Sequence, residues 1–150
     1  MILGDLWVYL GLFFSAFLAA TILPFSSEGL LSVLYLKGYS AALLLLFATV
    51  GNVLGSCTNY GLGYFGGNYL VEKVLRLKPE QFKKAEQRYQ KFGYWSLLFA
   101  WVPIIGDPIT VVAGVLRIKF LPFLILVLAG KFTRYATIIY LIAQHSASNT

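Results

Sequence analysis

Apolar residues form two long runs along the chain, Tyr39–Phe65 and Phe120–Ala143. Each run exceeds the ~20 residues with which an α-helix crosses the hydrocarbon core of a bilayer. The other apolar runs are shorter: residues 6–23, Leu30–Leu36, Trp95–Pro103 and Ile109–Leu116. The pattern therefore predicts two membrane-spanning helices, each preceded by two shorter helical segments.

The shorter segments meet at breaks that contain proline and an acidic residue. The first break reads Pro24-Phe25-Ser26-Ser27-Glu28-Gly29, and the second follows Pro103 as Ile104-Ile105-Gly106-Asp107-Pro108. Irregular backbone at membrane depth is tolerated only inside protein or beside a water-filled cavity. We therefore predict two re-entrant hairpins, whose break residues are Pro24, Ser26, Ser27, Pro103, Gly106 and Pro108. The hydroxyls of Ser26 and Ser27 are also suited to cap the helical segment that starts near Glu28.

The two halves align without a gap at an offset of 79 residues. Pro24 then falls on Pro103, and Glu28 falls on Asp107. Broken segments at matching places in two halves are typical of transporters. We predict one membrane domain, residues 1–150, made of repeat 1 (about 6–67), a linker (68–93) and repeat 2 (about 94–145).

The linker carries most of the cations. Seven of the 12 lysines and arginines lie between Lys73 and Lys91. Pro79 suits the first turn of a helix, and Gly93 suits its C-terminal stop. Apolar residues recur there at steps of three and four: Phe82, Ala85, Tyr89 and Phe92. Such an amphipathic basic helix either lies flat on an anionic membrane surface or packs on the bundle as a solvated connector.

Positive residues favour the cytoplasmic side of a membrane, so we expect the linker to be cytoplasmic. Arg117 and Lys119, just before the second long run, fit the same side. The two hairpins then enter from opposite faces, and the halves form an inverted repeat. Residues 6–23 stay open to two interpretations, a full membrane span or the first arm of the first hairpin.

Composition agrees with a lipid environment. The chain is 59% hydrophobic and 12% charged, with a mean hydropathy of +0.75. A chain of 150 residues cannot hide so much apolar surface in a soluble core. We therefore predict an all-α integral membrane protein. The net charge of +6 is concentrated in the linker, which indicates topology and not a nucleic-acid partner.

Four ionisable residues lie at membrane depth: Glu28, Asp107, Lys131 and Arg134. A charge near the bilayer centre costs ~3 kcal/mol on insertion scales, so such residues are candidates for function. Lys131 and Arg134 are three residues apart and share a helix face. We predict a midplane site for a charged substrate or a proton. The alternative is that these charges are purely structural ion pairs that close the bundle.

Small residues mark the first long run. The pairs Gly51-x3-Gly55 and Gly63-x3-Gly67 allow a neighbouring helix to approach closely. Asn52 and Asn59, on the same run, are predicted to make hydrogen bonds between helices. We interpret this run as a packing helix.

Catalytic and metal-binding patterns are absent from the sequence. It contains no HExxH, GxSxG or CxxC motif and a single cysteine, Cys57. The GxGxxG match at Gly61 lies inside an apolar run without a preceding strand, so it does not indicate a dinucleotide site. We expect no metal, no cofactor and no enzymatic activity.

These residues resemble the DedA superfamily of membrane proteins, also called the VTT or SNARE-associated domain, and most closely its YqaA-type branch. The resemblance covers nearly the whole chain. Its matching stretches are Leu23–Glu28, Gly51-Asn52 with Gly63 and Gly67, Trp101–Pro108 with Ala113-Gly114, and Gly130-Lys131 with Arg134-Tyr135. It implies two opposed re-entrant hairpins in the bacterial inner membrane. It also implies lipid transport, with undecaprenyl phosphate or phospholipids as substrates and with proton coupling.

One departure from the family stands out. Typical members carry Arg-x2-Pro-x2-Arg around the second-hairpin proline, whereas this chain has Ala100 and Gly106 at those positions. We expect Lys131 and Arg134 to supply the basic charge instead. The resulting hypothesis is a transporter or scramblase of a lipid or lipid-phosphate head group, acting as a homodimer, with Glu28 and Asp107 as proton-carrying acids. The alternatives are an ion- or proton-coupled transporter of small solutes and a membrane scaffold without transport.

Overall fold

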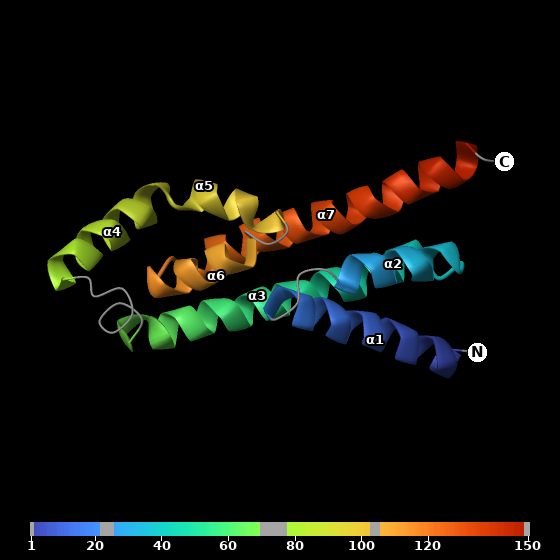
Figure 1. Cartoon of the computed structure of the whole chain (residues 1–150), viewed down its shortest axis with the longest axis horizontal. Helices are drawn as coiled ribbons and strands as arrows, with labels where there is room; N and C mark the ends of the chain where they lie inside the picture. Colours follow the sequence, from blue (N-terminus) through green and yellow to red (C-terminus); the bar gives the residue numbers. More distant parts are fainter. Residues whose placement is uncertain (1, 22–25, 70–77, 103–105, 149–150) are drawn as a thin grey trace. The chain divides into compact units, whose positions relative to one another are not determined.

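The computed structural model describes residues 2–21, 26–69, 78–102 and 106–148. All regular elements in these ranges are helical, which confirms the predicted all-α class for this part of the chain. In chain order they are α1 (Ile2–Thr21), α2 (Ser26–Leu36), α3 (Ala41–Tyr69), α4 (Pro79–Phe92), α5 (Tyr94–Leu97), the 3₁₀ helix η2 (Leu98–Trp101), α6 (Gly106–Val115) and α7 (Phe120–Ser148) (Figure 1).

Two of the described helices, α3 and α7, are long and apolar enough to cross a membrane. Their apolar stretches, Ala41–Gly67 and Phe120–Ala147, contain 27 and 28 residues. Large apolar side chains on both are exposed, such as Phe65 (87%) and Leu121 (67%). Exposed apolar surface of this kind marks contact with lipid or another apolar partner.

Helix α1 is a continuous helix of 20 residues. At 1.5 Å per residue it is about 30 Å long, close to the thickness of the hydrocarbon core. Its length therefore suits a full span, while α2, with 11 residues, is too short for one.

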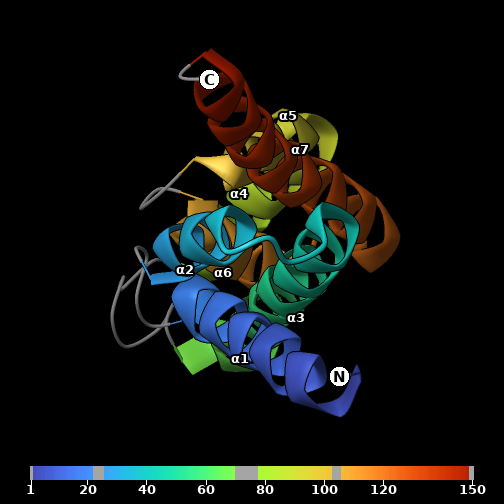
Figure 2. The ribbon, with the colours of Figure 1, turned by 90° about the vertical axis from the view of Figure 1, so that its right-hand side faces the viewer.

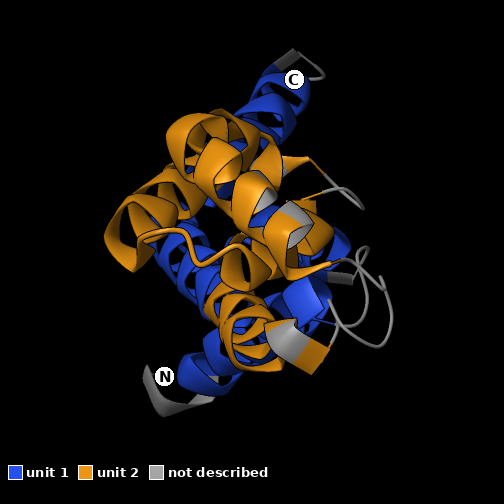
Figure 3. Ribbon diagram, turned by 90° about the vertical axis from the view of Figure 1, so that its left-hand side faces the viewer, with its two compact units in different colours: residues 1–55, 131–150 blue, residues 56–130 orange. Residues whose placement is uncertain are grey.

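The described helices divide into two compact units, each of which combines segments distant in sequence. Unit 1 contains residues 1–55 and 131–150, and unit 2 contains residues 56–130 (Figure 3). Each unit therefore includes one part of α3 and one part of α7. Each also includes the short helices of one half of the chain.

The core of unit 1 is apolar and tightly packed. Its fully buried side chains come from four helices: Leu12 and Ala16 of α1, Leu31 of α2, Leu44 and Ala48 of α3, and Tyr135 of α7. An added Cβ at Gly55 would lie 2.6 Å from the Cβ of Ala20, and one at Gly51 would collide with the carbonyl oxygen of Phe13. These glycines let α1 lie backbone to backbone against α3 (Figure 2).

Unit 2 packs α6 against the C-terminal part of α3 in the same way. An added Cβ at Gly63 would collide with the carbonyl oxygen of Val111, and one at Gly114 would collide with that of Tyr60. Gly67 approaches Val115, whose Cα would lie 3.3 Å from an added Cβ. Small residues on both helices thus allow close backbone contact.

The same turn ends α2 and α6, at positions 79 residues apart. Gly38 and Arg117 both adopt left-handed backbone, with φ of +86° and +51°. In both turns the N–H of this residue donates to the carbonyl three residues earlier (3.0 Å in each), and the next N–H donates five residues back (3.3 and 3.1 Å). This pattern is a Schellman motif, which satisfies the last carbonyls of a helix.

The linker helix α4 begins at Pro79 and ends at Phe92, directly before Gly93, as predicted. Proline suits this place because the first turn needs no N–H partner. Beyond Gly93 the chain forms only the short α5 and η2. The segment before the second break is therefore interrupted, whereas α1 before the first break is continuous.

Candidate functional site

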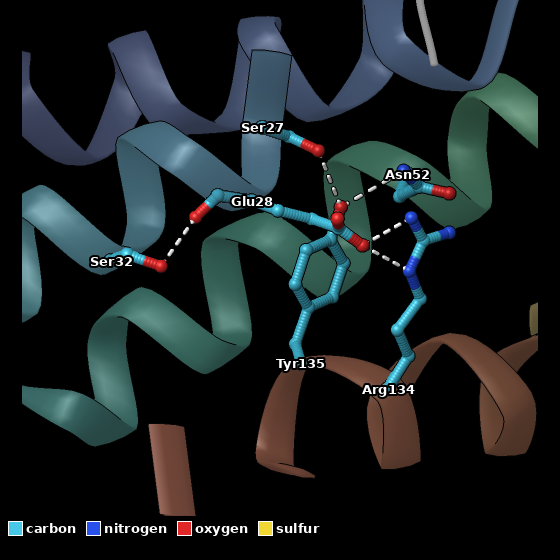
Figure 4. Close-up of polar contacts among 6 residues, drawn as sticks. All are labelled: Ser27, Glu28, Ser32, Asn52, Arg134 and Tyr135. Carbon is cyan, nitrogen blue, oxygen red and sulfur yellow. Dashed lines mark hydrogen bonds and ion pairs between the residues drawn. The ribbon is translucent and has the colours of Figure 1, made fainter. Parts of the chain in front are cut away.

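An ion pair joins Glu28 of α2 to Arg134 of α7 within unit 1. Nε of Arg134 donates to Oε1 of Glu28, and Nη2 of the same guanidinium pairs with the same oxygen (Figure 4). The Arg134 side chain is 11% exposed and the Glu28 side chain 30% exposed. The guanidinium is therefore largely enclosed, while the carboxylate is more open to its surroundings.

Tyr135 forms a second polar contact directly beside this ion pair. Its hydroxyl accepts a hydrogen bond from Nδ2 of Asn52 on α3 (2.9 Å) and shares one with the hydroxyl of Ser27 on α2 (3.0 Å) (Figure 4). Tyr135 is 1% exposed. Because Ser27 precedes Glu28 and Tyr135 follows Arg134, these hydrogen bonds fix the backbone positions from which the two charged side chains reach each other.

The sequence alone did not identify Tyr135 as a site residue. The feature that could have indicated it is its position, next to Arg134 and one helical turn after Lys131. Ser27, which together with Ser26 was considered as a cap of α2, lies inside the first turn of this helix, and its hydroxyl shares a hydrogen bond with Tyr135 on α7. Ser26 is the first residue of α2.

Lys131 is the most buried of the candidate charges. Only 1% of it is exposed, and it lies one helical turn before Tyr135 on α7. Spacing of four residues places both side chains on one face of that helix. A buried ammonium group requires compensation and is rarely retained without a purpose.

Buried polar residues form a stripe along α3. Thr49, Asn52, Ser56 and Asn59 recur at steps of three and four and are each at most 6% exposed. Nδ2 of Asn59 donates to the hydroxyl of Thr110 on α6 (3.3 Å). With the bond from Asn52 to Tyr135, this confirms the predicted interhelical bonds of both asparagines. Oδ1 of Asn52 and the hydroxyl of Thr49, one turn apart, have no hydrogen-bond partner among the described residues.

Asp107 belongs to unit 2, where it lies in the first turn of α6. Its carbonyl oxygen accepts a hydrogen bond from the hydroxyl of Thr110 (2.6 Å). Gly106, before it, is buried against the carbonyl oxygen of Ala100, while Pro108, after it, is exposed. The other break residues, Pro24 and Pro103, lie outside the described residues.

The structure brings Glu28 together with Arg134, and it places Lys131 in the same unit. Asp107 belongs to the other unit, unit 2. In the part of the chain that the structure describes, no group of three or more His, Cys, Asp or Glu side chains is arranged to hold a metal ion. The arrangement in unit 1 can instead bind an anion or exchange a proton.

Known proteins are similar to this chain over most of its length. A family model described as the VTT domain matches residues 2–144. The chain is 38% identical over 128 residues to the inner membrane protein YqaA of Escherichia coli, which covers 85% of each chain. It is 32% identical over 140 residues to an uncharacterized protein of Haemophilus influenzae, which covers 87% of this chain and 84% of that protein.

One more distant relative has a name that states a function. Over 86 residues the chain is 26% identical to undecaprenyl phosphate transporter A of Bacillus subtilis, which covers 55% of this chain and 43% of that protein. No solved structure matches the chain significantly.

Proposed function

The chain belongs to the VTT-domain family of membrane proteins, the DedA family, and on that premise we propose that it moves the head group of a lipid phosphate or phospholipid across the bilayer. The observation that carries this proposal is the ion pair between Glu28 on α2 and Arg134 on α7, a helix long and apolar enough to span a membrane. A distant relative is named as a transporter of undecaprenyl phosphate, so a polyprenyl phosphate is the first lipid to test.

Arg134 supplies the group that would bind the phosphate. A guanidinium presents its N–H donors in a planar fork that matches carboxylates and phosphates equally well. In unit 1 this fork is occupied by the carboxylate of Glu28, through Nε and Nη2. An entering phosphate would therefore replace Glu28 on the same donors. Lys131, three residues earlier on α7, adds a second cation at this depth.

Glu28 supplies the switch. Protonation of its carboxylate removes the negative charge that holds Arg134, so the guanidinium becomes available to the head group. Loss of the proton restores the ion pair and expels the phosphate. The greater exposure of Glu28 (30%) than of Arg134 (11%) suits a carboxylate that exchanges protons with an aqueous opening. We assign Asp107 the corresponding role in unit 2.

We further propose that the two halves form an inverted repeat of hairpin plus spanning helix, joined by a cytoplasmic α4. Several offsets of 79 residues support the repeat. Helices α2 and α6 end at Leu36 and Val115, and α3 and α7 begin at Ala41 and Phe120. The turns with Gly38 and Arg117 add the same hydrogen bonds at the same offset.

Topology is tested by single cysteines at matched positions. Gly29 and Pro108 are 79 residues apart, both exposed, and Gly29 has no neighbouring atom that a new Cβ would meet. In a Cys57→Ser background, Gly29→Cys and Pro108→Cys should react with a membrane-impermeant maleimide from opposite sides. Reaction of both from one side would exclude the inverted repeat. Gly106 is unsuitable, because an added Cβ would collide with Ala100.

A homodimer is also proposed, because two spanning helices and their short partners enclose little of a path by themselves. Light scattering of the detergent-solubilised protein should give twice the mass of one 16.7 kDa chain after detergent correction. A monomeric mass in a preparation active in transport would exclude the dimer.

The proposed function is tested with purified protein in liposomes that contain fluorescent phosphatidylglycerol or a short polyprenyl phosphate. Dithionite quenching then reports how fast the labelled head group crosses, with and without a pH gradient. The wild-type protein should accelerate crossing, and Glu28→Gln should abolish this effect. Glu80→Gln, a matched removal of an exposed acid on α4, should leave it unchanged. Uptake of a soluble solute without lipid crossing would favour a small-solute transporter.

A further inference from the structure

Unit 2 contains a groove that is lined by aromatic and basic residues. It is an open groove of about 600 Å³ between the C-terminal part of α3 and the start of α7. Its lining falls into an aromatic wall and a basic end: Tyr60, Tyr64, Phe65 and Phe120 form the wall, and Arg117 and Lys119 form the end. The volume lies within the range of small-molecule sites, about 300–1,000 Å³.

The aromatic wall is held rigidly in place. Tyr60 is buried and stacks on Tyr64, with ring centroids 6.1 Å apart, and packs against Phe120 at 5.4 Å. The hydroxyl of Tyr60 donates to the carbonyl oxygen of Ile118 (2.5 Å). This bond ties the wall to the turn that carries Arg117 and Lys119, so the apolar and basic parts of the groove keep a fixed spacing.

Arg117 occupies a backbone conformation that its side chain disfavours. Its φ is +51°, whereas the matching turn in the first half has Gly38 at this place. A non-glycine residue in this region is strained, and such strain is often found at functional positions. Here it places the guanidinium over the ring of Tyr64, 5.4 Å from the centroid, at the mouth of the groove. Arg117 and Lys119 are both exposed.

We propose that this groove binds one anionic phospholipid of the surrounding membrane, with its phosphate on Arg117 and Lys119 and an acyl chain along the aromatic wall. Charge complementarity selects the anionic head group, because the groove lining has two cations and no acidic residue. Basic pockets between helices near the membrane surface bind such head groups. The wall requires an acyl chain, so inorganic phosphate alone does not fill the site. Binding here does not depend on transport by the Glu28–Arg134 pair.

Cys57 makes the site directly testable, because it lines the groove and is the only cysteine of the chain. The wild-type protein in dodecyl maltoside is treated with N-ethylmaleimide, and alkylation is followed by intact mass. Added phosphatidylglycerol should slow alkylation, about fivefold at a concentration about four times the dissociation constant. Phosphatidylcholine and inorganic phosphate should leave the rate unchanged.

Two double variants distinguish lipid binding in this groove from a general effect of the protein's positive surface charge. Arg117→Gly with Lys119→Gln should lose the protection by phosphatidylglycerol, and the glycine also suits the left-handed turn, so the fold is kept. Lys83→Gln with Lys91→Gln removes the same charge from exposed positions of α4 outside the groove and should retain protection. Equal protection by both lipids, protection that persists without Arg117 and Lys119, or a Cys57 that does not react without lipid would each overturn the proposal.

Discussion

The two halves of the chain share a backbone plan but differ in their chemistry. Both have a short helix that ends in the same hydrogen-bonded turn and then a helix of 29 residues. In unit 1 the acid after the break, Glu28, pairs with Arg134. In unit 2 the backbone carbonyl of Asp107 accepts a hydrogen bond from the hydroxyl of Thr110, which in turn accepts one from Asn59 on α3. The turns that end the short helices are therefore the same in both halves, whereas these side-chain contacts use different residue types.

The halves also differ before their breaks. Helix α1 runs without interruption for 20 residues, whereas the stretch between the linker helix α4 and the second break is divided between α5 and η2. Gly93 separates α4 from α5, and its added Cβ would collide with Tyr89. The segment before the first break is therefore one continuous helix, and the segment before the second break is interrupted.

The largest effect is expected from breaking the Glu28–Arg134 pair. Glu28→Gln leaves the largely enclosed Arg134 without its partner and should destabilise the protein by ~3 kcal/mol or more, whereas Arg134→Gln leaves the more exposed Glu28 and should cost less. The double variant removes both charges and should be less destabilised than either single variant. Melting temperatures in detergent of the wild type, the two single variants and the double variant complete a double-mutant cycle. Additive losses would mean that the two groups do not stabilise each other.

A Cβ at the close helix contacts should have the next largest effect, and it should be similar in both halves. Gly51→Ala in unit 1 and Gly63→Ala in unit 2 place a methyl group against backbone of α1 and α6, which should cost about 3 kcal/mol each. Gly61→Ala, in the same helix but with no atom near its added Cβ, should instead be neutral or stabilising by up to about 1 kcal/mol. Equal melting temperatures for all three variants would contradict the packing of α3.

The sequence predicted the helices well because their ends are set by local chemistry. Pro79 and Gly93 bracket α4, and the starts of α3 and α7 follow the turns at Gly38 and Arg117. It also selected Glu28 and Arg134, but it did not decide which acid meets which base. That pairing joins residues 106 apart, and hydrophobic periodicity carries no information on such contacts.

The roles of Tyr135 and Arg117 likewise could not be predicted from the sequence. The tyrosine hydroxyl bonds to two helices that approach only in the folded chain. The left-handed backbone of Arg117 follows from the Schellman turn, a place where sequence patterns lead one to expect glycine. Both features depend on tertiary structure or on a local exception, so neither could be predicted from residue type.

Removal of the Tyr135 hydroxyl should have a moderate effect. Tyr135→Phe leaves the buried Nδ2 of Asn52 and the hydroxyl of Ser27 without this partner, which should cost about 2 kcal/mol. Thr110→Val is the corresponding change in unit 2 and should cost about 1 kcal/mol, because its bond to Asn59 is longer, at 3.3 Å. Thermal melting in one detergent would compare the two. A larger loss for Thr110→Val would show that unit 2 depends more on its polar contacts than unit 1.

The matched turns should give the smallest effects, of opposite sign. Arg117→Gly relieves left-handed backbone and should stabilise the protein by at most about 1 kcal/mol. Gly38→Ala imposes the same strain on the first turn and should destabilise it by about 1 kcal/mol, with no steric collision to add to it. Differential scanning fluorimetry resolves shifts of this size. Destabilisation by both changes would indicate that Arg117 contributes contacts that outweigh its strain.

Whether the Glu28–Arg134 pair takes part in lipid transport is decided by lipid crossing with the Glu28→Gln/Arg134→Gln double variant in liposomes. Structural and functional roles of the ion pair predict different results here, because the variant removes both charges together and keeps similar side-chain volume. If the pair takes part in transport, this variant is folded and more stable than either single variant, but it moves labelled phosphatidylglycerol or polyprenyl phosphate no faster than protein-free vesicles do. Crossing at the wild-type rate by this charge-free protein would contradict the account and leave the pair a purely structural role.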